Sequence, residues 1–205
     1  PAEAIPILEE SGLIIPVGKW IIQNAFSMCT ECRKYYPEFR VSINLSYVQI
    51  LKSPLMMELK QIIEHSGISC SGIIVELTES GYLEGTPAVR SVWNDMKKLR
   101  IQIALDDFGT GYSNLMNISN LEPDIVKLDR GFTLKALSRS YEYQLMQYVI
   151  EMVHKLNQYV CVEGVETKED LEKIKALGPD LIQGYYYSKP CSRDEFLKKF
   201  FGYSE

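Results

Sequence analysis

A repeated alternation of short β-branched runs with longer amphipathic stretches limits this chain to a small number of folds. Runs typical of strands occupy residues 40–46, 73–79, 101–107, 124–129, 159–165 and 181–187. Apolar residues recur at helical spacing between them, which predicts helices over residues 17–36, 56–67, 89–100, 141–157, 168–178 and 192–201. Strands that alternate with helices pair in parallel, with the helices packed outside the sheet.

Polar residues near the ends of nearly all these strands decide between an open sheet and a barrel. An open sheet gathers ligand groups mainly at one switch point, whereas the strand ends of a barrel converge on one mouth. The fold predicted is therefore an α/β barrel of the TIM type. Eight units take roughly 250 residues, so we expect residues 1–205 to be one domain that lacks its N-terminal strands. The polar residues are Asn44, Glu76, Asp106, Asp107, Lys127, Glu163 and Gln183.

Composition and charge exclude several classes of protein. The chain is 46% hydrophobic and 24% charged, which is too apolar for disorder, and its net charge is −5. An acidic chain does not bind a nucleic-acid polymer by bulk electrostatics. No apolar run reaches the ~20 residues that a membrane span needs, and no signal peptide is visible. We therefore expect no membrane contact within this chain and a cytoplasmic location, either alone or as part of a larger protein. Cys29 and Cys32 form a lone C-x-x-C that we interpret as helix core.

The acids at the strand ends predict a cation site. Two like charges ~4 Å apart repel by about 4 kcal/mol at an effective dielectric near 20, so several carboxylates in one cleft need cations. Ligands that are all oxygen atoms suit Mg²⁺ or Mn²⁺. His65 and His154 fall in helical stretches and are expected at the surface or in packing, which disfavours a zinc site.

Asp106 and Asp107 precede the Gly-rich segment 108–113. One carboxylate of an adjacent pair can bridge two ions while the other binds one, an arrangement suited to phosphodiester cleavage. Taken alone, the pair also fits a strand end with helix-capping signals. Lys127 alternates with apolar neighbours in its strand and needs an anionic partner. It either orients or helps to deprotonate an attacking water, or it forms a structural ion pair with Asp129 or another buried acid.

The ordered strings INLS, VELTES, ALDDFGTGYSNL, IVKLD, VEGVET and LIQGYYYSKP resemble the EAL family of cyclic di-GMP phosphodiesterases. The opening IPILEESGLI is similar to the first helix of that family. The resemblance implies that Asn44, Glu76 and Asp106 bind one metal ion, and that Asp106 bridges to a second ion bound by Asp107. It leaves two roles open for Glu163, as a ligand of the second ion or as the general base.

The resemblance also implies roles around this centre. Lys127 would position the water, and Gln183 would hydrogen-bond near the metal or a substrate phosphate. Glu79 and Glu166 would hold the Gly-rich loop. The implied substrate is cyclic di-GMP, the product the linear dinucleotide, and the assembly a homodimer.

One departure keeps a second hypothesis open. The E-A-L strand of the family, which carries an acidic metal ligand, lies upstream of the position where this sequence begins. Because these 205 residues do not include that ligand, we expect them to cleave the substrate poorly on their own. The protein is therefore expected to be an enzyme or, alternatively, a degenerate EAL domain that senses the dinucleotide or serves in dimerisation.

Overall fold

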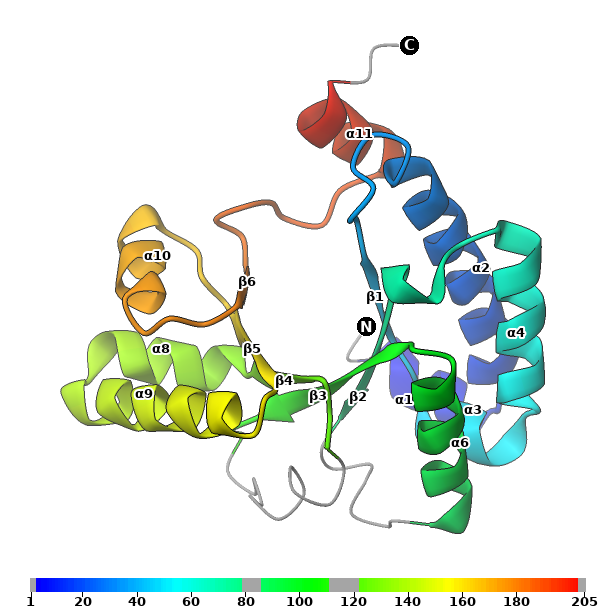
Figure 1. The fold of residues 1–205 in the computed structure, drawn as a ribbon, viewed down its shortest axis with the longest axis horizontal. Coiled ribbons are helices and arrows are strands. Elements are labelled where there is room, and N and C mark those ends of the chain that lie inside the picture. The colour runs from blue at the N-terminus through cyan, green and yellow to red at the C-terminus, as the bar shows by residue number, and fades with distance from the viewer. Residues whose placement is uncertain (1–2, 79–85, 111–121, 203–205) are drawn as a thin grey trace. The chain divides into compact units, whose positions relative to one another are not determined.

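A computed structural model gives the fold and describes residues 3–78, 86–110 and 122–202. Figure 1 shows strands and helices alternating along the chain, as the sequence predicts. The strands in the described residues are β1 (Val41–Asn44), β2 (Ile73–Thr78), β3 (Gln102–Phe108), β4 (Ile125–Leu128), β5 (Tyr159–Glu163) and β6 (Leu181–Gln183). The helices are α1 (Ala4–Glu10), α2 (Ile14–Cys32), α3 (Tyr47–Lys52), α4 (Leu55–Ser66), the 3₁₀ turn η1 (Cys70–Gly72), α6 (Pro87–Lys98), α8 (Arg130–Ser138), α9 (Ser140–Lys155), α10 (Lys168–Lys175) and α11 (Arg193–Phe201).

The chain divides into two compact units, which are described separately. Among the described residues, the first unit holds 3–77, 86–103 and 193–202, and the second holds 78, 104–110 and 122–192. The single-domain assignment for residues 1–205 stays a prediction.

The first unit is built around the parallel pair β1 and β2, which are in register from Val41 opposite Ile73 to Asn44 opposite Glu76. Helix α2 precedes β1 and helix α4 lies between β1 and β2. The two helices run parallel to each other, since Lys19 Nζ of α2 lies 3.3 Å from Glu58 of α4, and further along both helices Thr30 donates a hydrogen bond to the Ser66 carbonyl. Figure 1 shows α2 and α4 side by side. The core between strands and helices includes Phe26, Ile43, Leu59 and Val75.

The second unit continues the same pattern. Strands β3, β4, β5 and β6 pair in parallel in chain order, and α8, α9 and α10 form the helical layer beside them (Figure 1). Strands β4 and β5 are apolar on one face, which carries Val126, Leu128, Val160 and Val162, all at 0% exposure. Side chains alternate along a strand, so Lys127 and Glu163 lie on the opposite face.

Several predicted strands are shorter in the structure. The strand predicted over residues 181–187 ends at Gln183, because Gly184 packs against Val165 and the chain turns there, with Tyr187 N donating to Gly184 O over 3.1 Å. The strand predicted over residues 159–165 ends at Glu163, because Gly164 adopts a φ of +80°. Helices α3 and α8 are absent from the prediction, since each begins directly at a strand end.

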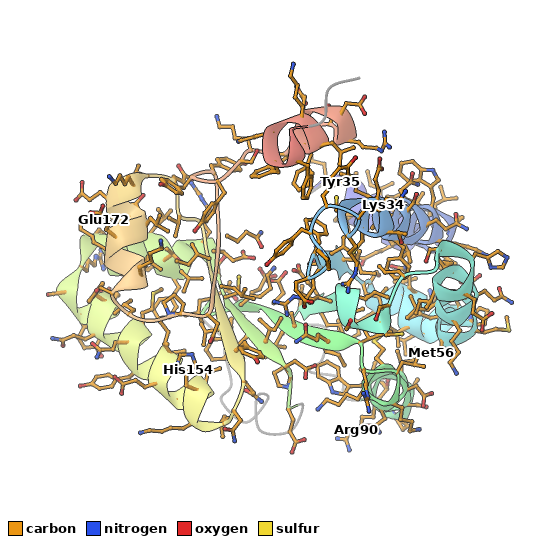
Figure 2. The ribbon with its side chains drawn as sticks, turned by 45° about the horizontal axis from the view of Figure 1, so that its top comes forward. Lys34, Tyr35, Met56, Arg90, His154 and Glu172 are labelled. Carbon is orange, nitrogen blue, oxygen red and sulfur yellow. The ribbon has the colours of Figure 1, made fainter. Side chains whose placement is uncertain are left out.

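The interpretation of the C-x-x-C pair as core is confirmed. Cys29 and Cys32 lie on the inner face of α2 at 0% exposure, and both are free thiols. Burial raises the pKa of both thiols, that of Cys32 to about 11. The expected positions of the histidines are also confirmed: His65 is exposed, and His154 on α9, labelled in Figure 2, is partly exposed and 2.9 Å from Asp180. None of the described helices has the length and apolarity that a bilayer crossing requires.

Candidate active site

Asn44 and Glu76 are brought together in the first unit. They occupy equivalent positions at the ends of β1 and β2, because the two strands place them opposite each other in the parallel register. Leu45 N donates to the backbone carbonyl of Glu76 over 3.0 Å, which fixes the two strand ends beside each other. The Glu76 side chain accepts a hydrogen bond from the Ser42 hydroxyl. Glu76 is only 6% exposed, and a buried carboxylate needs partners of this kind or a cation.

Asp106 and Asp107 form a β-bulge at the end of β3. Leu105 pairs with Val126 and Phe108 pairs with Leu128, so the two aspartates stand opposite Lys127 alone. A bulge re-aims side chains, and bulges are over-represented beside active sites. The two carboxylates consequently differ in environment, with Asp106 at 9% exposure and Asp107 exposed at the surface.

The backbone of this bulge is held in a strained conformation. Asp107 has a φ of +60°, in the left-handed region, and its N–H donates to Asp106 Oδ1 over 2.9 Å. Left-handed backbone costs roughly 1–2 kcal/mol for most residues with a side chain, and aspartate and asparagine tolerate it best. Gly109 follows with a φ of +104°, and a side chain there would meet Phe132. The start of the Gly-rich segment therefore requires its glycine.

Lys127 of β4 lies between two carboxylates of the second unit, those of Asp106 and Glu163. Its ammonium lies 3.0 Å from Asp106 and 2.6 Å from Glu163, and the lysine side chain is 6% exposed. The expectation that Lys127 needs acidic partners is therefore confirmed, with those partners on the neighbouring strands β3 and β5. Asp129, the alternative partner, begins α8 and accepts a hydrogen bond from Gly131 N over 2.7 Å.

Glu163 and Gln183 are neighbours across β5 and β6, in register at the ends of both strands. Glu166 lies further along the turn after β5 and forms an ion pair with Arg130 at 2.8 Å. The Glu166 carboxylate raises the pKa of the Arg130 guanidinium. Gly164 allows this pair to form, because a side chain there would collide with the Arg130 side chain. Glu79, the other residue predicted to support the loop, lies outside the described residues, as does the segment 111–121.

The oxygen chemistry of these groups fits a hard divalent ion. Carboxylates and an amide are the donors that Mg²⁺ and Mn²⁺ prefer, and the group in the second unit already holds one cation, the ammonium of Lys127. Within the described ranges no three His, Cys, Asp or Glu side chains form a ready-made metal cage.

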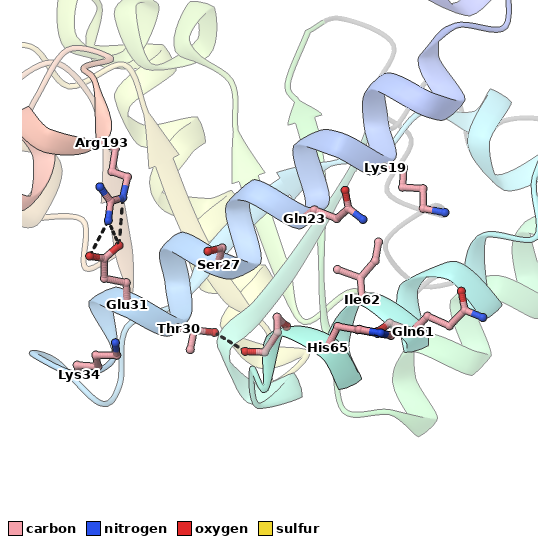
Figure 3. A pocket seen from close by; sticks show the side chains of 11 residues that line it. Lys19, Gln23, Ser27, Thr30, Glu31, Lys34, Gln61, Ile62, His65 and Arg193 are labelled. Carbon is pink, nitrogen blue, oxygen red and sulfur yellow. Dashed lines mark hydrogen bonds and ion pairs between the residues drawn. The ribbon is translucent and has the colours of Figure 1, made fainter.

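A surface groove between α2 and α4 does not coincide with these residues (Figure 3). It has a volume of about 680 Å³, and none of the predicted site residues lines it. Most residues that line this groove are polar, and an ion pair between Arg193 and Glu31, with nitrogen and oxygen 2.6 Å apart, lies at one end of it. The acidic residues at the strand ends, for which the sequence predicts metal binding and catalysis, do not line this groove.

Comparison with known proteins places the chain in a family. A family model described as the EAL domain matches residues 1–190. The chain belongs to the EAL domain family. The cyclic di-GMP phosphodiesterase PdeR of Escherichia coli (strain K12) is 32% identical over 190 residues, which is 93% of this chain and 29% of PdeR.

Solved structures of EAL proteins confirm the predicted fold class, an α/β barrel of the TIM type. The PaMucR phosphodiesterase in a c-di-GMP complex superposes with a TM-score of 0.88 at 26% identity, over 96% of this chain and 80% of that chain. Klebsiella pneumoniae BlrP1 in a manganese/cy-diGMP complex at pH 6 gives a TM-score of 0.73 at 25% identity, over 83% of this chain and 43% of BlrP1. This chain spans about a quarter of the length of the curated relatives it matches.

Three residues around Asn44 were not singled out from the sequence. Ser46 accepts a hydrogen bond from Val48 N over 3.1 Å, and Gln49 Oε1 accepts one from Ser46 N over 3.1 Å. Glu9 of α1 accepts a hydrogen bond from the Ser46 hydroxyl over 2.7 Å. The spacing S-x-x-Q is the signature of a helix capping box, so Ser46 and Gln49 were within reach of sequence reasoning. Nothing in the sequence pattern pairs Glu9 with Ser46, which lies 37 residues later.

Proposed function

We propose that this EAL domain is a divalent-metal-dependent phosphodiesterase that hydrolyses cyclic di-GMP to the linear dinucleotide pGpG. The observation that carries the proposal is the buried Lys127, shared by the carboxylates of Asp106 and Glu163 beside the Asp106–Asp107 bulge. Membership of the EAL family, with relatives named as cyclic di-GMP phosphodiesterases, supports the choice of substrate.

The proposed ligands follow from the donor chemistry. Asn44, Glu76 and Asp106 would hold one Mg²⁺ or Mn²⁺ ion, and Asp106 with Asp107 would hold a second. The exposed position of Asp107 and the buried position of Asp106 agree with one terminal and one bridging ligand. Bound ions would supply charge stabilisation for the attacking and leaving oxygens of the phosphodiester.

The roles proposed for the remaining residues rest on their contacts. The Lys127 ammonium lies within ion-pairing distance of two carboxylates, and an ammonium donates hydrogen bonds. Lys127 would therefore orient the attacking water. Glu163 would accept the proton of that water or complete the second metal site, and Gln183 would hydrogen-bond to a substrate phosphate. Glu166 and Glu79 would support the Gly-rich loop.

The decisive experiment is a cleavage assay on the intact protein. Cyclic di-GMP is incubated with the protein and Mg²⁺ or Mn²⁺, and pGpG is followed by chromatography, with a chelator as the control. Metal-dependent formation of pGpG supports the proposal. Tight binding of cyclic di-GMP without cleavage would favour the alternative, a sensor domain. Sedimentation of the same sample tests the proposed homodimer, and fractionation of the source cells tests the proposed cytoplasmic location.

A further inference from the structure

The turn that carries Asn44 is tied to its surroundings at three points. Leu45 N donates to the Glu76 carbonyl over 3.0 Å, Ser46 N donates to Gln49 Oε1 over 3.1 Å, and the Ser46 hydroxyl donates to Glu9 over 2.7 Å. These bonds hold the backbone directly after Asn44. The exposed Asn44 amide therefore depends for its position on this turn.

Glu9 is the remote member of this set. It lies on α1, a helix of seven residues in which no residue is buried. Apolar packing consequently contributes little to the docking of α1, and the Glu9–Ser46 hydrogen bond is a specific polar link between α1 and the end of β1. A charged acceptor strengthens a hydrogen bond to about twice the strength of a neutral one.

Gln49 is held in place by a close approach to α2. Its side chain is buried at 4% exposure and lies against Gly18, where an added Cβ would be 2.7 Å from Gln49 Cδ. Glycine in a helix interior costs about 1 kcal/mol relative to alanine. Gly18 within α2 is explained by the space that the Gln49 side chain needs in order to accept the hydrogen bond from Ser46 N.

We propose that Glu9 is a positioning residue, which acts through Ser46 to hold the Asn44 turn against Glu76 and so sets the affinity of the first metal site. The inference rests on the proposed function, since Asn44 and Glu76 are ligands only in that proposal. It assigns a role to α1, a helix outside the strand ends that carry the ligands. Partners that orient metal ligands typically change metal affinity by about 10–100-fold when they are removed.

Two substitutions separate this role from helix capping. Ser46→Asp keeps a good N-cap acceptor for Val48 N but removes the donor to Glu9, because an ionised aspartate only accepts hydrogen bonds. Glu9→Ala removes the acceptor and leaves the cap intact. Ser46→Thr keeps both functions. Glu10→Ala is the matched control, because it removes the same charge from the neighbouring, exposed position of α1.

Metal binding to the intact protein is the direct measurement. Mn²⁺ is titrated and the free ion is followed by electron paramagnetic resonance, with thermal melts recorded for every variant. Glu9→Ala and Ser46→Asp should weaken Mn²⁺ binding about tenfold or more, whereas Ser46→Thr and Glu10→Ala leave it unchanged. In the cleavage assay, the metal concentration for half-maximal rate should rise in the same two variants, while saturating metal restores the turnover number.

The outcomes distinguish the two proposals. Unchanged Mn²⁺ affinity in folded Glu9→Ala and Ser46→Asp, with active wild type, overturns the positioning role and leaves the proposed function intact. If the wild type neither binds Mn²⁺ nor forms pGpG, the proposed function fails and the positioning role fails with it. As a second readout, amide exchange at Leu45 should accelerate in Glu9→Ala and not in Glu10→Ala, because the Leu45–Glu76 hydrogen bond lies in the turn.

Discussion

The Lys127 ammonium lies 2.6 Å from Glu163 and 3.0 Å from Asp106, so one buried cation links β4 to the strands on both sides of it. The carboxylates are themselves mostly buried, with side-chain exposures of 19% and 12%. Removing the ammonium would leave both acids without this shared cation in a poorly solvated setting. The group that we propose for catalysis is therefore also a structural element of the second unit.

Lys127→Met should reduce both activity and stability. Removing one partner of a buried ion pair costs about 3–5 kcal/mol, and misplacing the attacking water that Lys127 would orient lowers the rate by about 10²-fold. Urea unfolding measures the first effect and pGpG formation the second. Added Mg²⁺ should recover part of the stability, because a bound cation again balances the acids.

The control for this substitution is Lys175→Met, since Lys175 is an exposed lysine of α10 in the same unit. It should leave both measurements unchanged. An unfolding free energy of Lys127→Met equal to that of the wild type would contradict the buried ion-pair account.

Asp106→Asn should lower turnover strongly while preserving the fold, because Lys127 keeps its ion pair with Glu163. The amide oxygen can still accept the hydrogen bond from Asp107 N, so the bulge keeps its internal contact. The negative charge that would bridge two ions is lost, and we expect turnover to fall by at least the about 10–100-fold that loss of a mere partner of a metal ligand causes. Cleavage assays and Mn²⁺ titration test this together, with the surface substitution Asp95→Asn as the control. Full activity of Asp106→Asn would show that Asp106 is not the bridging ligand.

The clustering of polar residues at strand ends was predictable from the sequence, because the carboxyl ends of neighbouring parallel strands lie at the same edge of a sheet. Asn44 and Glu76 were both placed at strand ends from the alternation of strands and helices, and the register of β1 and β2 sets them opposite each other. The acidic partners of Lys127 were predictable from the cost of a buried unpaired charge. The family resemblance supplied the individual roles, which stay proposals.

Other features depended on tertiary structure and could not be predicted. The bulge at Asp106 and Asp107 arises from the pairing of β3 with β4, which no local pattern encodes. The strand predicted to include Tyr185–Tyr187 has strong β propensity, but the approach of Gly184 to Val165 ends β6 early. The contact between Glu9 and Ser46 joins two helices across 37 residues, so spacing rules for a single helix do not reach it.

The C-x-x-C thiols should be unreactive in the folded protein. Burial raises the pKa of Cys32 from its ordinary value of 9.0 to about 11, and raises that of Cys29. The Cys29 thiol also donates weakly to the carbonyls of Phe39 and Gly72. At neutral pH a thiol reagent should label the exposed Cys191 first, and Cys29 and Cys32 only after unfolding.

The same shift makes a prediction for stability at high pH. The folded state holds the Cys32 proton more tightly than the unfolded state does, so this stabilisation is complete below pH 9 and is lost as pH rises toward 11. Urea unfolding of wild type and Cys32→Ala across this range should show a steeper decline for the wild type. Rapid labelling of Cys29 or Cys32 in the folded protein would contradict the account.

Asp107 should prove to be a position where function opposes stability. Its φ of +60° disfavours most side chains, so Asp107→Ala should destabilise the fold by about 1 kcal/mol, whereas Asp107→Gly and Asp107→Asn should be neutral or slightly stabilising. All three variants remove the carboxylate and should lose metal-dependent cleavage. Thermal melts and pGpG assays on the three proteins separate the two effects. Retained activity in the well-folded Asp107→Asn would show that the left-handed conformation serves the backbone of the bulge alone, with no role for the carboxylate in binding the second ion.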